Sequence, residues 1–348
     1  MKKFIAVMTA AAMLTSLSAC GASASTASSA AESTASSAAA DSTSGSTADA
    51  TTYKVAIVQQ LDHASLDEIR TAIEAELDAK AAEKGITIEY KDFNGQNDAT
   101  TLNQIGTQVV SDGYDAVIPI ATLAAQCMTT ACESTKTPVI YAAISDPAAA
   151  DLTDIDYVTG TSDALNTQSI MDMIFAVQPE AKTIGIVYTT SEANSVYSVK
   201  VYEEKAAEYG FTIASVGVTA QSEVTQAVDT LIAKGVDCFS NLTDNNVVGV
   251  LSSILEKTNE AGIPVYGSEI EQMKLGCVAG AGLDYVQLGI QTGKMAAKIL
   301  TGEATCQDLP YEVIENYSLY VNSNALAQMG ITLPDDLAQE AEEVGATA

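Results

Sequence analysis

The central part of the chain alternates short apolar runs with stretches in which apolar residues recur every three or four positions. The run YKVAIVQQ at residues 53–60 predicts a strand. A helix is expected after it, because apolar side chains then follow at helical spacing at Leu66, Ile69, Ile73 and Leu77. The alternation continues with predicted strands at 86–93, 115–120 and 138–144. Strands that alternate with helices of this length indicate βαβ units on a parallel sheet.

The same pattern restarts after Pro179, with predicted strands at 182–188, 210–218, 235–242 and 263–268. The two halves also agree in detail, since each contains a helix, a Gly-x-Asp step, an apolar strand, a polar turn with threonine, a second helix and a Pro-Val strand. We therefore expect an α/β protein with two similar Rossmann-like lobes built on parallel sheets. A single, larger Rossmann sheet is the alternative.

The N-terminal region has a different pattern. Two lysines precede an apolar run that ends near Leu14, and this run predicts an export signal, because it is too short to span a membrane. Leu-Ser-Ala-Cys at residues 17–20 is similar to a bacterial lipobox, which makes Cys20 the expected lipidation site and the mature N-terminus; an ordinary cleavage site with a chance cysteine is the alternative. Residues 21–52 lack large apolar side chains and should form a disordered tether.

The formal net charge of −29 argues against partners that require a basic face, so we expect no binding to nucleic acid. Besides Cys20 the chain has five cysteines at irregular spacing, which do not form a disulfide framework or a zinc motif. We expect them to be small buried apolar residues: Cys127, Cys132, Cys238, Cys277 and Cys306.

Enzymatic chemistry has little support. The first predicted strand is not followed by a Gly-x-Gly-x-x-Gly loop, and the chain contains no Walker-type Gly-Lys-Ser/Thr and no Gly-x-Ser-x-Gly elbow. The single histidine, His63, lies at the first turn of a predicted helix, where helix capping, ligand contact and general-base catalysis are the three interpretations. With no nucleophile near His63 in sequence, we expect no catalytic residue. With one histidine and no CxxC pair we expect no metal, and with no nucleotide-binding motif we expect no cofactor.

Polar residues follow the predicted strands of both halves. Ligands of open parallel sheets bind beyond the carboxyl ends of the strands, where helix N-termini present free N–H groups. If the two lobes face each other, these turns line one cleft that is rich in hydroxyls, amides and carboxylates and poor in basic side chains, which suits a small zwitterion. The turns comprise Gln59–Gln60, Asp92, Ala121–Thr122, Ser145–Asp146, Thr189–Ser195, Thr243–Asn245 and Ser268–Glu269.

At these residues the chain resembles the substrate-binding lipoproteins of ABC transporters, and within them the tryptophan/tyrosine-type branch, whose characterised members bind aromatic amino acids. The resemblance rests on segments in the order of the family that together span residues 53 to about 334: QQLDHASLDE, IATLAAQ, AAISDPAAADL, VTGTSD, YTTSEANSV, LTDNNVV, VYGSE and GLDYVQLGIQTGKMAAKILTGE. The chain departs from the family pattern at Leu123 and Ala193, where proline is frequent, and at Asn246, where threonine is frequent. These departures leave the polar contacts in place and bear on loop shape and ligand selectivity.

The resemblance implies a type I periplasmic-binding-protein fold, in which the chain crosses between the lobes near 161–163 and again near 282–285. We expect the following division: signal peptide 1–20, of which residues 1–19 are removed; tether 21–52; lobe 1 at 53–162 plus 282–305; and lobe 2 with a C-terminal helix at 163–281 plus 306–348. The helix marked by Leu288, Met295 and Ile299 should pack back on lobe 1, and the segment 317–337 should cross once more and end in a helix.

Candidate ligand contacts follow from chemistry and position. Hydroxyl, amide and backbone donors at Ser191, Asn194 and Ser195 are expected to hold a carboxylate, as is Thr122 in the equivalent place of lobe 1; ordinary helix capping is the alternative. The ammonium group is expected on one or two of Asp163, Asp244 and Glu269. The remaining candidates line the cleft or the side-chain pocket: Gln60, His63, Ser145, Asp146, Ser162, Thr243, Asn245, Ser268, Asp284 and Tyr285.

Apolar walls for the ligand side chain are expected from Leu61, Tyr188 and Tyr285, whereas Tyr141 and Tyr266 are expected to be buried on strands. The resemblance implies a monomeric, lipid-anchored, extracytoplasmic protein that delivers its ligand to an ABC permease with its ATPase. The alternatives are a nucleoside or a branched-chain amino acid as the ligand, and a sensor that presents its lobe geometry to a receptor.

Overall fold

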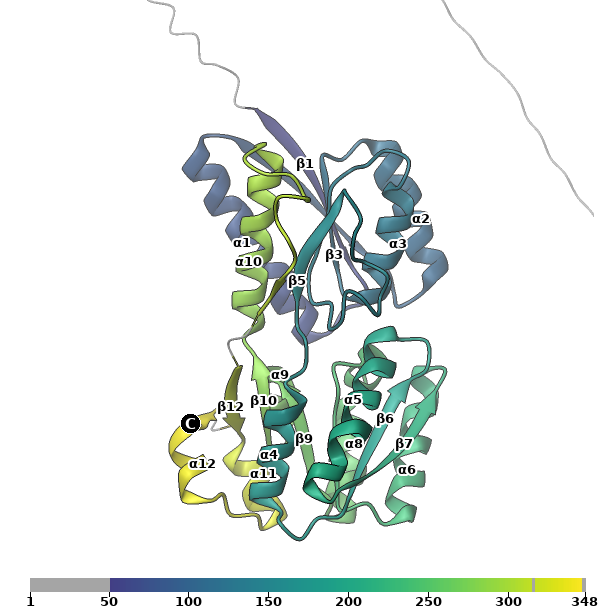
Figure 1. Cartoon of the computed structure of the whole chain (residues 1–348), viewed down its shortest axis with the longest axis vertical. Helices are drawn as coiled ribbons and strands as arrows, with labels where there is room; N and C mark the ends of the chain where they lie inside the picture. Colours follow the sequence, from purple (N-terminus) through teal and green to yellow (C-terminus); the bar gives the residue numbers. More distant parts are fainter. Residues whose placement is uncertain (1–50, 315–316, 346–348) are drawn as a thin grey trace, which may run out of the picture. The chain divides into compact units, whose positions relative to one another are not determined.

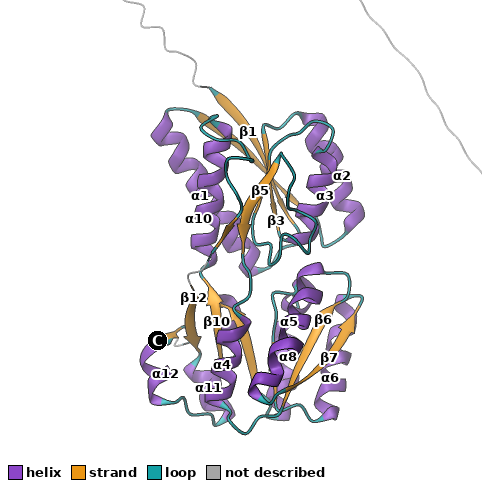
Figure 2. Ribbon diagram, in the orientation of Figure 1, coloured by secondary structure: helices purple, strands orange, loops and turns teal. Residues whose placement is uncertain are grey.

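The computed structural model describes residues 51–314 and 317–345. Within them the strands form two parallel-rich sheets, so the alternative of a single, larger Rossmann sheet is wrong (Figures 1 and 2). The sheet of lobe 1 has the strand order β11-β5-β4-β3-β1-β2, and every neighbouring pair is parallel. Its strands are β1 (Thr52–Gln59), β2 (Thr87–Asn94), β3 (Ala116–Ile120), β4 (Val139–Tyr141), β5 (Val158–Ser162) and β11 (Glu312–Val313).

Helices cover both faces of this sheet, because its central strands are apolar on both sides. Ile57 and Ile118 face α1 (Ala64–Lys84) and α10 (Tyr285–Leu300). Val58 and Val117, which point the opposite way, face α2 (Ala99–Asp112) and α3 (Thr122–Cys132). The helices end where the sequence predicts: α1, for example, stops at Gly85, which takes the left-handed conformation at φ 65°.

Lobe 2 repeats the design with the strand order β13-β12-β10-β9-β8-β6-β7. Its strands are β6 (Thr183–Thr189), β7 (Thr212–Val218), β8 (Cys238–Ser240), β9 (Val265–Glu269), β10 (Ala279–Leu283), β12 (Tyr317–Val321) and β13 (Glu342–Glu343). Its helical segments are α4 (Thr167–Val177), α5 (Ala193–Tyr209), η1 (Gln221–Glu223), α6 (Val224–Lys234), α7 (Asn245–Val248), α8 (Leu251–Ala261), α9 (Ile270–Leu275), α11 (Ser323–Met329) and α12 (Asp335–Glu340). Strand β12 is antiparallel to β10.

The chain passes between the lobes near the predicted places. Strand β5 ends in lobe 1 at Ser162, and β10 ends in lobe 2 at Leu283, directly before α10 returns to lobe 1. The third passage lies between β11 and β12. This passage comes later in the chain than expected. Residues 306–313, assigned to lobe 2 on the sequence, run along lobe 1, where Glu312 pairs with Thr161 of β5.

Helix α10 packs on α1, as the resemblance implied, and two of its small residues set how close it comes. A Cβ atom on Gly289 would lie 2.6 Å from the Ile69 carbonyl oxygen, and one on Gly293 would lie 2.8 Å from the Glu76 Cβ. Glycine at these helix positions therefore lets the two backbones approach, at the cost of some helix propensity. Of the helices described, none combines the length and apolar composition required to cross a membrane.

Candidate ligand-binding site

Hydrogen bonds join the two lobes at the carboxyl ends of their strands. The shortest of them run from Asn97 Nδ2 to Asn246 Oδ1, at 2.7 Å, and from Ser65 Oγ to Glu269 Oε1, at 3.1 Å. Two longer contacts of 3.4 Å accompany them: His63 Nε2 with Asn245 Oδ1 and Ser145 Oγ with Thr243 Oγ1. The polar turns of the two lobes therefore meet, as the cleft hypothesis required.

Three buried acceptor groups near these contacts have no hydrogen-bond partner within the residues described: Glu192 Oε1, Asn194 Oδ1 and His63 Nδ1. Asn245 links His63 to Glu192, and Glu192 in turn contacts Asn194. The backbone N–H and Nδ2 of Asn245 donate to Glu192 Oε2 at 3.0 and 2.9 Å, and its Oδ1 faces His63 Nε2. Asn194 Nδ2 contacts the same Glu192 oxygen at 3.5 Å. Buried polar atoms normally find partners, so this group of unpaired acceptors is unusual.

The electrostatics of this group favour an incoming cation. Burial first, and then the neighbouring carboxylate of Asp244, raise the pKa of Glu192 to about 8. Burial lowers the pKa of His63, so its imidazole is neutral near pH 7. In a neutral ring whose Nε2–H donates to Asn245, Nδ1 is an acceptor; this tautomer follows from the hydrogen-bond network.

The three carboxylates predicted to bind an ammonium group already accept hydrogen bonds on both oxygens. Asp163 accepts from Ser145 Oγ and Tyr285 Oη at 2.9 Å each, and burial raises its pKa. Asp244 accepts from the backbone and hydroxyl of Thr189 and from the N–H of Val247. Glu269 accepts from Ser65 and from the N–H of Glu271, and burial raises its pKa to about 7. The hydrogen bonds of each of the three carboxyl groups therefore stabilise the hinge or a turn.

Several other predicted residues have structural partners. Gln60 is buried, donates to Asn97 and accepts from the N–H of Leu123. Asp146 accepts from the N–H groups of Ala148 and Ala149, and Asp284 accepts from the N–H of Gln287. Ser162 donates to the Ser145 carbonyl, and Ser268 is bonded to the side chain of Gln272. Ser191 is exposed beside the start of α5, whereas Ser195 and Thr122 are buried in the first turns of α5 and α3.

Strained backbone marks two of the turns in lobe 1. Ala121, directly before α3, has φ 76°, and Ala143, just after β4, has φ 59°. Non-glycine residues rarely adopt positive φ, and such residues cluster at functional sites. The strain at Ala143 also explains why β4 stops at Tyr141 although the apolar run continues to Ile144.

Of the predicted apolar walls, Leu61 and Tyr188 are partly buried beside the two cores, and Tyr285 is buried. Tyr141 and Tyr266 are fully buried on β4 and β9, as expected. The five cysteines of the lobes are buried and free, which confirms their interpretation as apolar residues. Cys20, the signal peptide and the tether lie outside the described residues, apart from the last two residues of the tether.

Sequence reasoning missed two residues of this site. Glu192 lies within the predicted turn Thr189–Ser195 but was not among the candidate contacts, and only the fold shows that this residue is 7% exposed. Asn97 follows β2, a strand with few fully buried residues. No sequence pattern indicated that its side chain bonds to Asn246 in the other lobe.

Two similar α/β lobes that meet at the carboxyl ends of their parallel strands, with unpaired acceptors between them, define a solute-binding protein. A family model described as ABC transporter substrate binding protein matches residues 54–345, and the chain belongs to that family. Members of this family bind solutes and are not enzymes.

Relatives of known type are similar over most of their length. The chain is 31% identical over 278 residues to a tyrosine-binding protein of Clostridioides difficile, covering 78% of this chain and 79% of the relative. A Streptococcus pneumonia ABC domain in complex with L-Trp has 30% identity and TM-score 0.77, covering 83% of this chain and 99% of its own. The ligand-free, open structure of a Clostridium difficile substrate-binding protein with adhesive properties has 31% identity and TM-score 0.64, covering 85% and 100%.

Proposed function

We propose that this chain captures an aromatic amino acid between its two lobes and delivers it to the permease of an ABC importer. The observation that carries the proposal is the group of three unpaired acceptors, Glu192 Oε1, Asn194 Oδ1 and His63 Nδ1. A primary ammonium group has three N–H donors and a positive charge. It therefore matches these acceptors in number, and once Glu192 has lost its proton the positive charge offsets the repulsion between Glu192 and Asp244.

The ligand carboxylate is assigned to the helix starts on either side. Thr122 opens α3 and Ser195 lies in the first turn of α5, and both are buried. Helix N-termini present N–H groups and the positive end of the helix dipole, which stabilise an anion. The amino acid would then be held by its ammonium group at the three unpaired acceptors and by its carboxylate at these two helix starts.

The aromatic side chain is the finer part of the proposal. It is supported by the two relatives at 30–31% identity, one named for tyrosine and one bound to L-Trp. Leu61 and Tyr188, both partly buried, are proposed as its apolar contacts. Phenol or indole rings gain both apolar burial and stacking against such walls.

Hinge closure is the proposed mechanism. The cross-lobe bonds of Ser65 and Asn97 form only when the lobes are together, and a ligand that contacts both lobes shifts the population toward that state. The structure has a higher TM-score with the L-Trp complex, 0.77, than with the open, ligand-free relative, 0.64, although the two sequence identities are nearly equal. This difference supports a closed arrangement in the structure described.

The N-terminal sequence completes the proposal. A diacylglycerol on Cys20 would supply two acyl chains, enough for stable anchoring at the outer face of the cell membrane. Residues 21–52 would then tether the lobes, and the permease with its ATPase would receive the ligand.

A ligand panel measured by differential scanning fluorimetry tests the function. L-Tyr, L-Trp or L-Phe at about 100 times its Kd should stabilise the protein by about 2.7 kcal/mol. Stabilisation by a nucleoside or by a branched-chain amino acid, with no response to the three aromatic amino acids, would refute the proposed ligand and leave the fold and family intact.

A further inference from the structure

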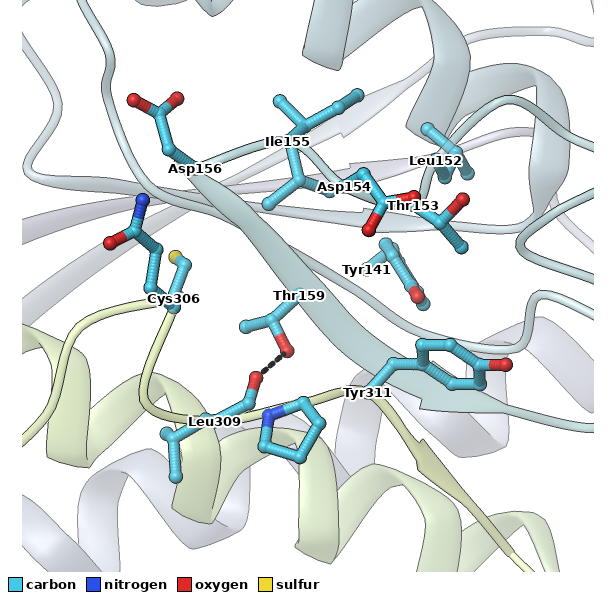
Figure 3. Close-up of a pocket in the computed structure, with 13 residues that line it drawn as sticks. Tyr141, Leu152, Thr153, Asp154, Ile155, Asp156, Thr159, Cys306, Leu309 and Tyr311 are labelled. Carbon is cyan, nitrogen blue, oxygen red and sulfur yellow. Dashed lines mark hydrogen bonds between the residues drawn. The ribbon is translucent and has the colours of Figure 1, made fainter.

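A cavity lies in lobe 1, away from the contacts between the lobes. It lies between β5 and the segment Cys306–Tyr311, called the strap here, which runs past that strand toward β11, and it is partly open to solvent (Figure 3). The strap is fastened to β5, because Thr159 Oγ1 donates to the Leu309 carbonyl at 2.6 Å. The cavity has a volume of about 460 Å³, within the range of small-molecule sites.

A fully buried hydroxyl in this cavity has no partner. Tyr141 lines the cavity from β4 with a side chain that is 0% exposed, and its Oη makes no hydrogen bond within the described part of the chain. Leaving a buried hydroxyl unpaired costs about 1–3 kcal/mol. Tyr266, the buried tyrosine of lobe 2, is instead satisfied by Gln178 at 3.0 Å. The Tyr141 hydroxyl therefore has unused hydrogen-bonding capacity at the wall of the cavity.

The charge around the cavity selects the sign of that molecule. No lysine, arginine or histidine lines it, whereas Asp154 and Asp156 do. Asp156 lies 3.5 Å from Lys136, but the exposed carboxylate of Asp154 has no ion pair or hydrogen bond among the residues described, and its backbone is held at φ 59°. An anion would be repelled here, and a cation would be attracted.

The apolar residues that line the cavity indicate what the uncharged part of a bound molecule is. Leu152 and Val158 are buried apolar residues that line the cavity together with Leu309 of the strap. Tyr311, which is 40% exposed, adds a second aromatic ring beside Tyr141 (Figure 3). Apolar walls bind a hydrocarbon body, and tyrosine faces attract an ammonium ion.

We propose that this cavity is a second ligand site, which takes a primary ammonium ion with a small apolar or aromatic body and no carboxylate. The ammonium group donates to the Tyr141 hydroxyl oxygen and to the Asp154 carboxylate, and the body packs against Leu152, Val158 and the strap. The inference is independent of the ligand proposed for the site between the lobes, because the lining residues all lie on lobe 1 and the strap.

Fluorine NMR with 4-fluorophenethylamine as the probe tests the site. The probe resonance should broaden on addition of the protein, with a Kd about fivefold weaker in Tyr141→Phe and about tenfold weaker in Asp154→Asn. Asparagine tolerates positive φ, so the second variant keeps the turn. Asp151→Asn is the matched control, since Asp151 is also exposed with positive φ, at 57°, but does not line the cavity.

Each outcome decides the proposal. Weakening in Tyr141→Phe and Asp154→Asn, with unchanged binding in Asp151→Asn and in Glu192→Gln, supports it. Equal binding by all variants would reveal diffuse attraction to an acidic surface, and loss of binding in Glu192→Gln would place the probe between the lobes. Either result, or the absence of broadening, overturns the second site.

Discussion

Replacing Glu192 by glutamine removes the carboxyl group that must ionise to bind the ammonium group, and it keeps nearly the same shape. The glutamine oxygen can still accept from the Asn245 N–H and Nδ2, which bond to Glu192 Oε2 at 3.0 and 2.9 Å. Its NH₂ group, however, takes the place of the unpaired Oε1, so a donor faces the incoming ammonium group. One charge-assisted hydrogen bond is lost, which corresponds to about 1.5–3 kcal/mol and thus to roughly 10- to 150-fold weaker binding.

Ligand fluorescence measures this change directly. The chain contains no tryptophan, so the emission of added L-Trp reports only on the ligand. For the unmodified protein the emission should shift to the blue and saturate; for Glu192→Gln the midpoint should move to a higher concentration of L-Trp. Glu203→Gln is the matched control, because it makes the same substitution at an exposed position of the same helix. Equal affinities for the unmodified protein and Glu192→Gln would refute the assigned role of Glu192.

The pH dependence gives the same test a second readout. Below about pH 8 the buried Glu192 carboxyl of the free protein holds a proton, and this proton must leave before the carboxylate can accept from an ammonium group. Affinity should therefore rise with pH between 7 and 8, by at most about tenfold per pH unit. The rise should be absent in Glu192→Gln. The same raised pKa makes Glu192 reduce the stability of the ligand-free protein as pH rises from its unfolded value toward 8.

Three further changes probe the hinge, the helix packing and the thiols. Tyr285→Phe removes one of the two 2.9 Å donors of the buried Asp163 carboxyl group and should lower the free energy of unfolding by about 1–3 kcal/mol, measured by urea denaturation. Gly289→Ala places a methyl group 2.6 Å from the Ile69 carbonyl oxygen and should destabilise by about 1–3 kcal/mol; an unchanged denaturation midpoint would contradict the close packing of α10 on α1. The five cysteines of the lobes are buried, and burial raises the pKa of Cys132 to about 11, so Ellman's reagent should modify them only on unfolding; rapid reaction of the native protein would show the burial to be wrong.

The positions of strands and helices followed from local patterns. Apolar runs located the parallel strands, and left-handed glycines such as Gly85 and Gly113 ended the helices where the periodicity stopped. The repeat of the pattern after Pro179 was sufficient to predict two lobes. The strand β11 was not predicted, because its two residues carry no periodicity. Its place in lobe 1 depends on pairing with β5, some 150 residues earlier.

The sequence predicts a site at the carboxyl ends of the strands, but it does not indicate which of the carboxylates there have partners in the fold. Asp163, Asp244, Glu269 and Glu192 all follow strands and look alike in the sequence. What distinguishes them is the number of donors that the folded chain brings to each one. Asp163 receives Tyr285 from 122 positions away, whereas one oxygen of Glu192 receives none. Such differences arise from tertiary contacts, and no local pattern records them.

A crystal structure of the protein with a bound aromatic amino acid tests the central claim most directly. We expect the ligand between the two lobes, with its ammonium nitrogen at about 2.7–3.2 Å from Glu192 Oε1 and Asn194 Oδ1 and its carboxylate at the first turns of α3 and α5. A ligand bound outside the cleft, or one that turns its carboxylate toward Glu192, would contradict the account.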